Sequence, residues 1–356
     1  MNFKKNLSKQ FLINFLIISN LWSKGFWVKY GFEIFDYVID APSLALGSAN
    51  VSFNTNSVSS SIINPIHSYK KTNFLSITHQ SRFAGTINSE LLGFQIARKE
   101  KLINVNILYE GIGNIPDTQN MLLDWGYDGQ FGTNDLGEGN GILDEGERLD
   151  LDNIRYFNQS RLGFYGAFKN EINNIPVGFG LKILSHSLDD HHALGIGLDL
   201  GIEKKINSYN FAIVMRNIPS SGMIWDNGTI EGTLPSISLG LHAPLNISKI
   251  RNLQMDMMAR FDAKLFNSHL DSQIRFHNMS YDLAIGFEGT YKDRFKLRLG
   301  QDFLKNITGG VGLNWDNLII DYSFSPAYSN KSLGNNHLIT INLSYRWLLE
   351  VITNKS

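Results

Sequence analysis

Apolar and polar residues alternate most strictly near the end of the chain. From Ile339 to Trp347 every second residue is apolar, and Thr340, Asn342, Ser344 and Arg346 fall on the opposite face. A strand with one apolar and one polar face that ends in aromatic residues is typical of the last strand of a bacterial outer-membrane barrel, which has lipid outside and a polar lumen inside. The pattern therefore predicts a strand up to Trp347.

The same alternation recurs along the chain, with turn-forming residues between the segments. The predicted strands are Thr72–Phe83, Ser89–Arg98, Leu102–Gly111, Asn153–Lys169, Pro176–Ser187, Ala193–Lys204, Tyr209–Asn217, Leu234–Ala243, Asn252–Asp262, Tyr281–Tyr291, Arg294–Phe303, Ile307–Trp315, Asn317–Ser325 and Asn336–Trp347. About 14 strands, an even number, suit a bacterial single-chain barrel. We therefore expect an all-β fold, a transmembrane antiparallel β-barrel in the bacterial outer membrane.

The lengths of the predicted connections support this fold. When the connections are counted from a periplasmic N-terminus, the four longest fall on one side of the barrel, as extracellular loops should. These are 112–152, 218–233, 263–280 and 326–335. The connections of the other parity are shorter and are expected to be periplasmic turns.

The N-terminal region divides into two segments. Lys4, Lys5 and Lys9 precede an apolar run of about ten residues, which predicts a signal peptide over 1–24, too short for a spanning helix. An uncleaved anchor or a buried strand is the alternative. Residues 25–71 are rich in small and polar residues, so we expect a hatch or plug inside the lumen, with a disordered tail as the alternative. The barrel would cover 72–347, followed by a C-terminal tail, 348–356.

Composition excludes several other classes of protein. The 356 residues are 43% hydrophobic and 18% charged with a net charge of -1, which gives no electrostatic footprint for nucleic acid. The chain has no cysteine, so a disulfide framework and lipid attachment through cysteine are both excluded. The sequence contains no nucleophile elbow, phosphate loop or zinc-helix motif, which predicts a non-enzymatic protein without a catalytic residue.

Two pairs of motifs resemble a known family. Ala41–Val51 with Ser61–Pro65 is similar to the "ALGGA" and "NPA" motifs of the PorV/PorQ family, and Asp321–Pro326 with Leu333–His337 looks like that family's closing strands. Ile66 stands where the family usually has alanine, and 348–356 extends beyond the terminal aromatic residue. The resemblance implies a barrel similar to the FadL fatty-acid transporters, with a role in type IX secretion.

Carboxylates and glycines are densest in an acidic insert, 112–152, which is expected to be extracellular. Calcium loops need oxygen ligands at alternating positions, a glycine at the sharp turn and a carboxylate near the end. Two overlapping registers partly meet this rule. The candidate calcium ligands are Asp124, Asp128, Asp135, Glu138, Asn140, Asp144 and Glu147. The alternative is a solvated acidic loop. The stretch 189–192, with two aspartates and two histidines, is a weaker metal candidate because adjacent histidines lack a fixed spacing.

The sequence is compatible with two functions. The leading hypothesis is a barrel that assists the export or surface attachment of secreted proteins, with outer-membrane lipid and secretion components as partners. The alternative is a FadL-like channel for small hydrophobic molecules. A protein shuttle needs an exposed partner surface, whereas a transporter needs an apolar pocket and an opening through or beside the hatch.

Overall fold

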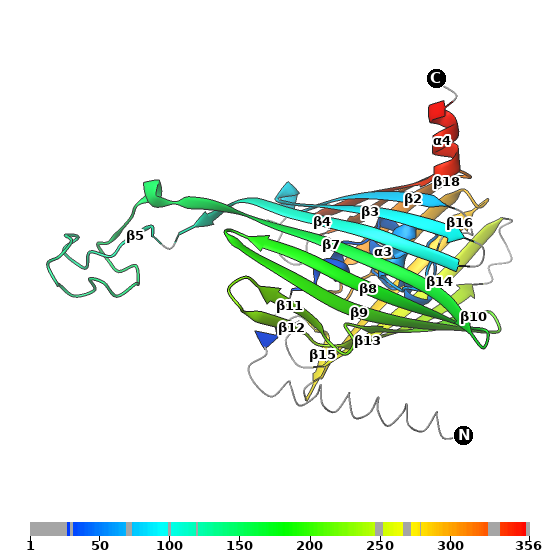
Figure 1. Cartoon of the computed structure of the whole chain (residues 1–356), viewed down its shortest axis with the longest axis horizontal. Coiled ribbons are helices and arrows are strands. Elements are labelled where there is room, and N and C mark those ends of the chain that lie inside the picture. Colours follow the sequence, from blue (N-terminus) through cyan, green and yellow to red (C-terminus); the bar gives the residue numbers. More distant parts are fainter. Residues whose placement is uncertain are drawn as a thin grey trace.

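The computed structural model describes residues 27–28, 31–68, 73–98, 101–118, 120–245, 252–265, 272–277, 279–326 and 335–353, so the predicted signal peptide lies outside the described residues. Eighteen strands form one sheet, and fourteen of them build the wall of a closed antiparallel barrel (Figure 1). The wall strands are β2 (Phe74–Arg82), β3 (Ile87–Arg98), β4 (Lys101–Asp117), β7 (Arg155–Ile172), β8 (Ile175–Leu188), β9 (His191–Ile206), β10 (Tyr209–Arg216), β13 (Ser236–Leu245), β14 (Leu253–Leu265), β16 (Met279–Tyr291), β17 (Phe295–Gln301), β18 (Ile307–Trp315), β19 (Leu318–Ser325) and β20 (Asn336–Ser344). The predicted fold class is confirmed.

Pairing between the first and last wall strands closes the barrel. β2 runs antiparallel to β20 in a register that places Phe74 opposite Ser344 and Ser81 opposite His337. Every wall strand therefore has two neighbours, and no backbone edge is left open within the hydrocarbon, where unpaired N–H and C=O groups would be costly.

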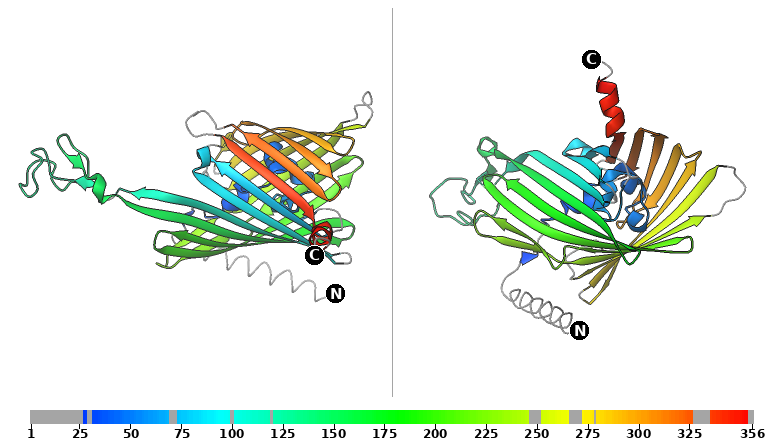
Figure 2. Two further views of the ribbon diagram at one scale, coloured as in Figure 1. Left: turned by 90° about the horizontal axis from the view of Figure 1, so that it is seen from above. Right: turned by 45° about the vertical axis from the view of Figure 1, so that its right-hand side comes forward.

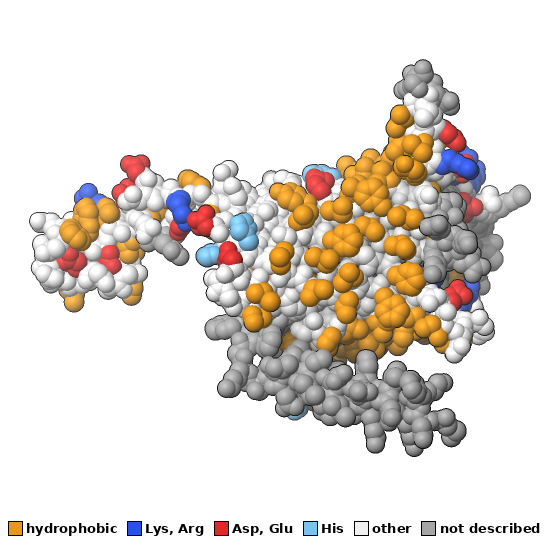
Figure 3. Space-filling model, viewed as in Figure 1, with side chains coloured by type: hydrophobic (Ala, Val, Ile, Leu, Met, Phe, Trp, Pro, Cys, Tyr) orange, Lys and Arg blue, Asp and Glu red, His pale blue; other side chains and the backbone are white. Residues whose placement is uncertain are grey.

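The wall has its hydrophobic side chains outside. In β9, Leu194, Ile196 and Leu198 are 69%, 61% and 48% exposed, while Asp199 next to them is buried. Figure 3 shows such side chains across the visible face of the wall, and other wall strands also carry exposed hydrophobic residues, which together form a belt. A belt of this kind is stable only against lipid, and polar residues face the lumen as in outer-membrane barrels. The protein is therefore a bacterial outer-membrane protein.

One wall strand is interrupted, and the predicted loop 218–233 is partly wrong for this reason. β10 ends at Arg216, and β11 (Ser221–Trp225) continues alongside β9 after a four-residue break. β11 then forms a hairpin with β12 (Ile230–Thr233), which leads into β13. Sequence alternation alone misses such a hairpin, because both strands are short. β1 (Trp27–Val28) pairs in parallel with β12.

Residues 31–68 lie inside the barrel, and we call them the hatch (Figure 2). The hatch contains α2 (Ile34–Tyr37), α3 (Ala41–Ala45) and the 3-10 turns η2 (Asn50–Ser52) and η3 (Val58–Ile62). Asp40 begins α3, and its carboxylate accepts a hydrogen bond from the backbone N of Ser43 (2.9 Å), as an N-cap does. Short turns of this kind allow 38 residues to fold within the lumen.

The acidic insert projects from one end of the barrel, which we call the extracellular rim because the predicted long loops lie there (Figure 1). β4 continues to Asp117 through a bulge between Ile112 and Ile115, so the connection begins later than predicted. β5 (Leu122–Leu123) and β6 (Arg148–Leu149) form a small separate sheet at the base of the projecting loop, and the 3-10 turn η5 (Leu151–Asn153) precedes β7. A second 3-10 turn, η4 (Phe83–Gly85), joins β2 to β3 on the same rim.

The prediction for the end of the chain is wrong in its last residues. β20 ends at Ser344, and Tyr345–Thr353 form the helix α4, which includes Trp347. The neighbouring strand β2 begins opposite Ser344, so the residues that follow have lost a ladder partner and satisfy their backbone groups within a helix. Among the described residues, no helix is long and apolar enough to cross a membrane.

Candidate functional site

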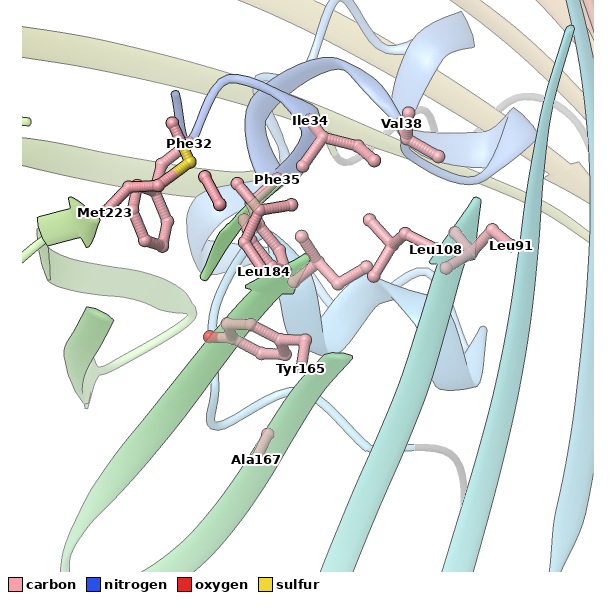
Figure 4. Packing of buried hydrophobic residues seen from close by; sticks show 12 residues of the cluster. Phe32, Ile34, Phe35, Val38, Leu91, Leu108, Tyr165, Ala167, Leu184 and Met223 are labelled. Carbon is pink, nitrogen blue, oxygen red and sulfur yellow. The ribbon is translucent and has the colours of Figure 1, made fainter. Parts of the chain in front are cut away.

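Hydrophobic side chains at the start of the hatch pack against the luminal face of the wall. The cluster contains Phe32, Ile34 and Phe35 of the hatch with Leu91, Leu108, Tyr165 and Leu184 of β3, β4, β7 and β8 (Figure 4). The ring centroids of Phe35 and Tyr165 lie 6.2 Å apart. Complete burial of one such side chain stabilises by about 1.5–3 kcal/mol. This apolar contact anchors the first part of the hatch, and smaller apolar clusters join later parts of the hatch to the wall.

The family-like segment Ala41–Val51 is bound to the wall through its backbone. The hydrogen bonds run from Ala41 N to Thr340 Oγ1 (2.8 Å), from Thr308 Oγ1 to the carbonyl of Ala45 (3.0 Å) and from Arg260 Nη1 to the carbonyl of Ser48 (3.2 Å). These three donors and acceptors come from β20, β18 and β14. The bonds therefore fix the path of the hatch across the lumen.

Glycines on both sides of this contact allow the two backbones to lie close together. Gly47 has φ +62°, a left-handed conformation that favours glycine, and a Cβ there would lie 2.5 Å from the carbonyl oxygen of Gln301. A Cβ on Gly300 of β17 would overlap the carbonyl carbon of Leu46. The hatch and the wall are thus in direct backbone contact here.

The second family-like segment is held by one arginine. Arg216 of β10 donates through Nη1 to the carbonyl of Ile62 (3.1 Å) and through Nη2 to that of Ile63 (2.6 Å). Asn64 donates through Nδ2 to the carbonyl of Val51 (2.8 Å), which joins the two family-like segments. The hatch therefore forms one body with several ties to the wall.

A pocket of about 360 Å³ lies between the hatch and the extracellular rim. Its apolar lining includes Ile39 and Leu44 of the hatch and Phe83, Leu304 and Pro326 of the rim. Pockets for small molecules commonly measure roughly 300–1,000 Å³ and combine an apolar lining with a few polar groups. This mouth pocket is therefore large enough for a small, mostly apolar molecule, and the hatch forms part of its lining.

Polar groups close one side of the mouth pocket. Tyr37 donates its hydroxyl proton to Oε1 of Glu110 (2.9 Å) and accepts a bond from Nη1 of Arg161 (2.8 Å). Arg82 pairs with Glu110, and its guanidinium carbon lies 4.2 Å from the centre of the Tyr37 ring. Burial raises the pKa of Tyr37 to about 12, so the phenol stays protonated and acts as a donor. The cluster ties α2 to β2, β4 and β7.

Two further carboxyl groups near the mouth have raised pKa values. Burial, and then the neighbouring charge of Asp36, raise the pKa of Glu33 to about 7. Burial also raises the pKa of Asp302, which lines the mouth pocket and accepts a bond from the backbone N of Asn306 (2.8 Å). A group with a pKa near 7 is partly protonated at neutral pH.

All seven predicted calcium ligands lie in the loop between β5 and β6, where the two predicted registers are interleaved. Asp124 accepts bonds from the backbone N of Gly139 (2.8 Å) and Gly141 (2.7 Å), which lower its pKa. Asp128, Asp135, Glu138, Asn140, Asp144 and Glu147 also take part in hydrogen bonds within the loop. In the part of the chain that the structure describes, no group of three or more acidic or histidine side chains is placed to hold a metal ion. The calcium site stays a prediction.

The weaker metal candidate, residues 189–192, is occupied by ion pairs. Asp189 lies 2.6 Å from Nη2 of Arg155, and Nδ1 of His191 lies 2.9 Å from Asp226. These contacts link the β8–β9 turn to the start of β7 and to the β11–β12 turn.

Comparisons with known proteins identify no family for this chain. No protein-family model and no curated protein matches the chain. Among solved structures, the deltaS2S3 mutant of the TodX monoaromatic hydrocarbon channel has a TM-score of 0.49 at 11% identity, covering 86% of this chain and 99% of that one. A Pseudomonas aeruginosa FadL homologue gives 0.46 at 11% identity, with 86% and 98% covered. CdiB from Acinetobacter baumannii gives 0.37 at 9% identity, with 77% and 60% covered.

Proposed function

We propose that the protein passes small hydrophobic molecules through the outer membrane, and that they bind first in the mouth pocket. The observation that carries this proposal is the apolar lining of that pocket, to which both the hatch and the rim contribute. A bound molecule would contact Ile39 and Leu44 on one side and Leu304 on the other. Binding would thus act directly on the hatch, which must shift or rearrange before the molecule can continue through the lumen. This is the second of the two functions that the sequence leaves open, and it requires no catalysis.

The contacts of the hatch are consistent with such a rearrangement. Several of its ties are single hydrogen bonds, each of which contributes only about 0.5–1.5 kcal/mol net. The hatch also contains buried hydroxyl groups, including those of Ser57, Ser59 and Ser60, and its apolar contacts with the wall are divided into separate clusters. A segment held in this way can move without unfolding the wall, whose strands are paired independently of it.

The test measures entry of the hydrophobic dye N-phenyl-1-naphthylamine into cells whose outer membrane otherwise excludes it. We expect the protein to increase dye entry and Leu304→Asp to abolish that increase, because a carboxylate in the pocket disfavours an apolar ligand. The matched control is Leu136→Asp in the acidic insert, where the side chain is 79% exposed. Equal dye entry with Leu304→Asp and the native protein would refute the proposed binding site.

A second proposed function follows from the acidic insert. We infer that this insert contacts a secreted protein or a secretion component, as in the PorV/PorQ-type role in type IX secretion. The supporting observation is a set of exposed apolar side chains on an extracellular loop, where water would disfavour them. These are Phe131 (81%), Leu136 (79%), Ile142 (64%), Leu143 (55%) and Leu151 (68%).

Deletion of residues 120–147 separates the two functions. If the insert binds a secreted partner, the deletion reduces the amount of secreted protein attached to the cell surface and leaves dye entry unchanged. Loss of dye entry with normal surface attachment would instead assign the insert to transport. Heat-modifiable gel migration of the deletion variant is the control for an intact barrel.

We further propose that calcium binds the loop between β5 and β6. Asp135 leaves its Oδ1 atom buried without a hydrogen-bond partner, while Oδ2 accepts a bond from the backbone N of Asp128 (2.8 Å). Clustered carboxylates repel one another until a cation neutralises them, and calcium accepts several oxygen ligands in a flexible arrangement. A bound ion would stiffen the insert as a docking element for the secreted partner.

A further inference from the structure

The helix α4 projects sideways from the periplasmic rim, across the direction of the strands (Figures 1 and 2). Its nine residues span about 14 Å at the rise of an α-helix. Because the strands cross the membrane, a helix that runs across them at the rim runs along the membrane surface. α4 leaves the wall at the end of the barrel opposite the acidic insert.

The residues of α4 divide into two faces. Tyr345, Leu348, Leu349 and Ile352 follow the i, i+3, i+4, i+7 spacing of one helical stripe, and Arg346, Glu350 and Thr353 follow the same kind of spacing on the other side. In Figure 3, the hydrophobic side chains of the helix lie on the same side as the belt, and charged side chains lie to the right of the helix, away from the belt. Leu349 and Ile352 are 43% and 60% exposed, so the described chain leaves a large part of each side chain uncovered.

An apolar groove joins the base of α4 to the outer wall. It has a volume of about 450 Å³, and its apolar lining includes Leu75, Phe94, Ile96 and Val105 of β2, β3 and β4 together with Tyr345 and Leu348 of the helix. Phe94 and Ile96 are 38% and 52% exposed and belong to the belt that faces lipid. The groove is thus continuous with the lipid-facing surface.

We propose that α4 is an interfacial anchor that lies in the inner leaflet of the outer membrane, with phospholipid acyl chains filling the groove beneath it. Lipid is the occupant because the groove and the apolar face of α4 continue the belt. Arg346 and Glu350 then face the headgroups and the periplasm, which is the arrangement of in-plane amphipathic helices. The anchor fixes the periplasmic end of β20, and with it the seam where β20 meets β2.

The absence of cysteine makes this proposal directly testable. Spin labels are attached to Ile352→Cys and, as the matched control on the opposite face, to Glu350→Cys, and each full-length protein is reconstituted into vesicles of phosphatidylethanolamine and phosphatidylglycerol. At position 352 we expect frequent collisions with oxygen and few with a water-soluble nickel chelate. At position 350 we expect the reverse. Frequent nickel collisions at both positions would overturn the proposal.

Lipid retention tests the groove. Native mass spectrometry of the detergent-solubilised protein should detect retained phospholipid, and Leu348→Glu should reduce the number of retained molecules. Thr353→Glu, which adds the same carboxylate on the polar face, should leave that number unchanged. Heat-modifiable migration confirms a folded barrel in each variant. If position 352 were shielded from both collision reagents and Leu348→Glu lost no lipid, α4 would contact protein, and the lipid proposal would be wrong.

Discussion

The hydroxyl oxygens of Ser59 and Ser76 lie 3.3 Å apart across the contact between hatch and wall. Ser59 belongs to η3 and Ser76 to the luminal face of β2, and both are buried. A disulfide needs its two Cβ atoms roughly 3.5–4.5 Å apart, a spacing that this pair of adjacent side chains is expected to reach. The native chain has no cysteine, so no other thiol would compete.

We predict that the double variant Ser59→Cys and Ser76→Cys, once oxidised, no longer increases entry of N-phenyl-1-naphthylamine. The disulfide would hold η3 against β2 and prevent the hatch from moving. Addition of a reductant should restore dye entry, and each single variant should behave as the native protein. Unchanged entry after complete oxidation would show that transport does not require this part of the hatch to leave the wall.

Gly300→Val is expected to unseat the hatch. The added side chain would overlap Leu46, and overpacking of this kind costs about 1–3 kcal/mol. The variant should therefore admit a hydrophilic chromogenic β-lactam, measured by its hydrolysis in the periplasm. Gly309→Val is the matched control, because a Cβ there would lie 3.6 Å from Leu299 Cδ2, an ordinary contact. Equal leakage through both variants would argue against hatch displacement.

The raised pKa of Glu33 predicts a hatch that is more stable in acid. In the folded protein this pKa rises from 4.5 to about 7, so the folded state binds the proton more tightly than the unfolded state. The resulting stability is complete below the unfolded pKa and is lost as the pH rises through about 7. Hydrogen exchange of 31–45, corrected for intrinsic rates, should show more protection near pH 5 than near pH 8. Glu33→Gln should remove that difference.

Alternation along the strands could be predicted from the sequence because each wall strand meets two different environments. Alternation in the predicted strand Leu102–Gly111 places Asn104 and Asn106 on the luminal face, and both are buried there. Their partners could not be predicted, since Asn104 donates to the carbonyl of His67 (2.7 Å), 37 residues away. Contacts of this range depend on how the hatch folds inside the closed barrel.

The mouth pocket was not predicted for a related reason. Its lining comes from several separate segments, including the hatch around Leu44, the β2–β3 turn and the turn at Leu304. A single apolar residue in a loop gives no signal in the sequence that it lines a pocket. Only the closure of β20 on β2 brings these segments together. The predicted end of β20 is wrong because the residues up to Trp347 fit helical spacing as well as strand alternation. The loss of a ladder partner after Ser344 decides in favour of the helix.

The acidic insert allows a direct test of the predicted calcium site. Residues 124–147 form many hydrogen bonds between carboxylates and backbone N–H groups, but the loop has few buried apolar side chains to stabilise it. A cation that neutralises the carboxylates would add the missing stabilisation. We therefore predict slower proteolytic cleavage of 112–152 in calcium than in a chelator, at equal ionic strength.

Two of the predicted ligands differ in the hydrogen bonds that they accept, so their alanine variants are expected to behave differently. Glu147 accepts bonds from the backbone N of Gly126 (2.9 Å) and of Asp144 (2.8 Å), so Glu147→Ala removes both a ligand and a structural acceptor. Asp144→Ala removes a carboxylate that accepts a bond only from a side chain, Nδ2 of Asn140 (2.6 Å). If calcium binds, Asp144→Ala should lose the protection by calcium while cleavage in chelator stays near the native rate. Equal cleavage of the native protein with and without calcium would instead favour a solvated acidic loop. The proposed secreted partner would then bind an insert that no ion stiffens.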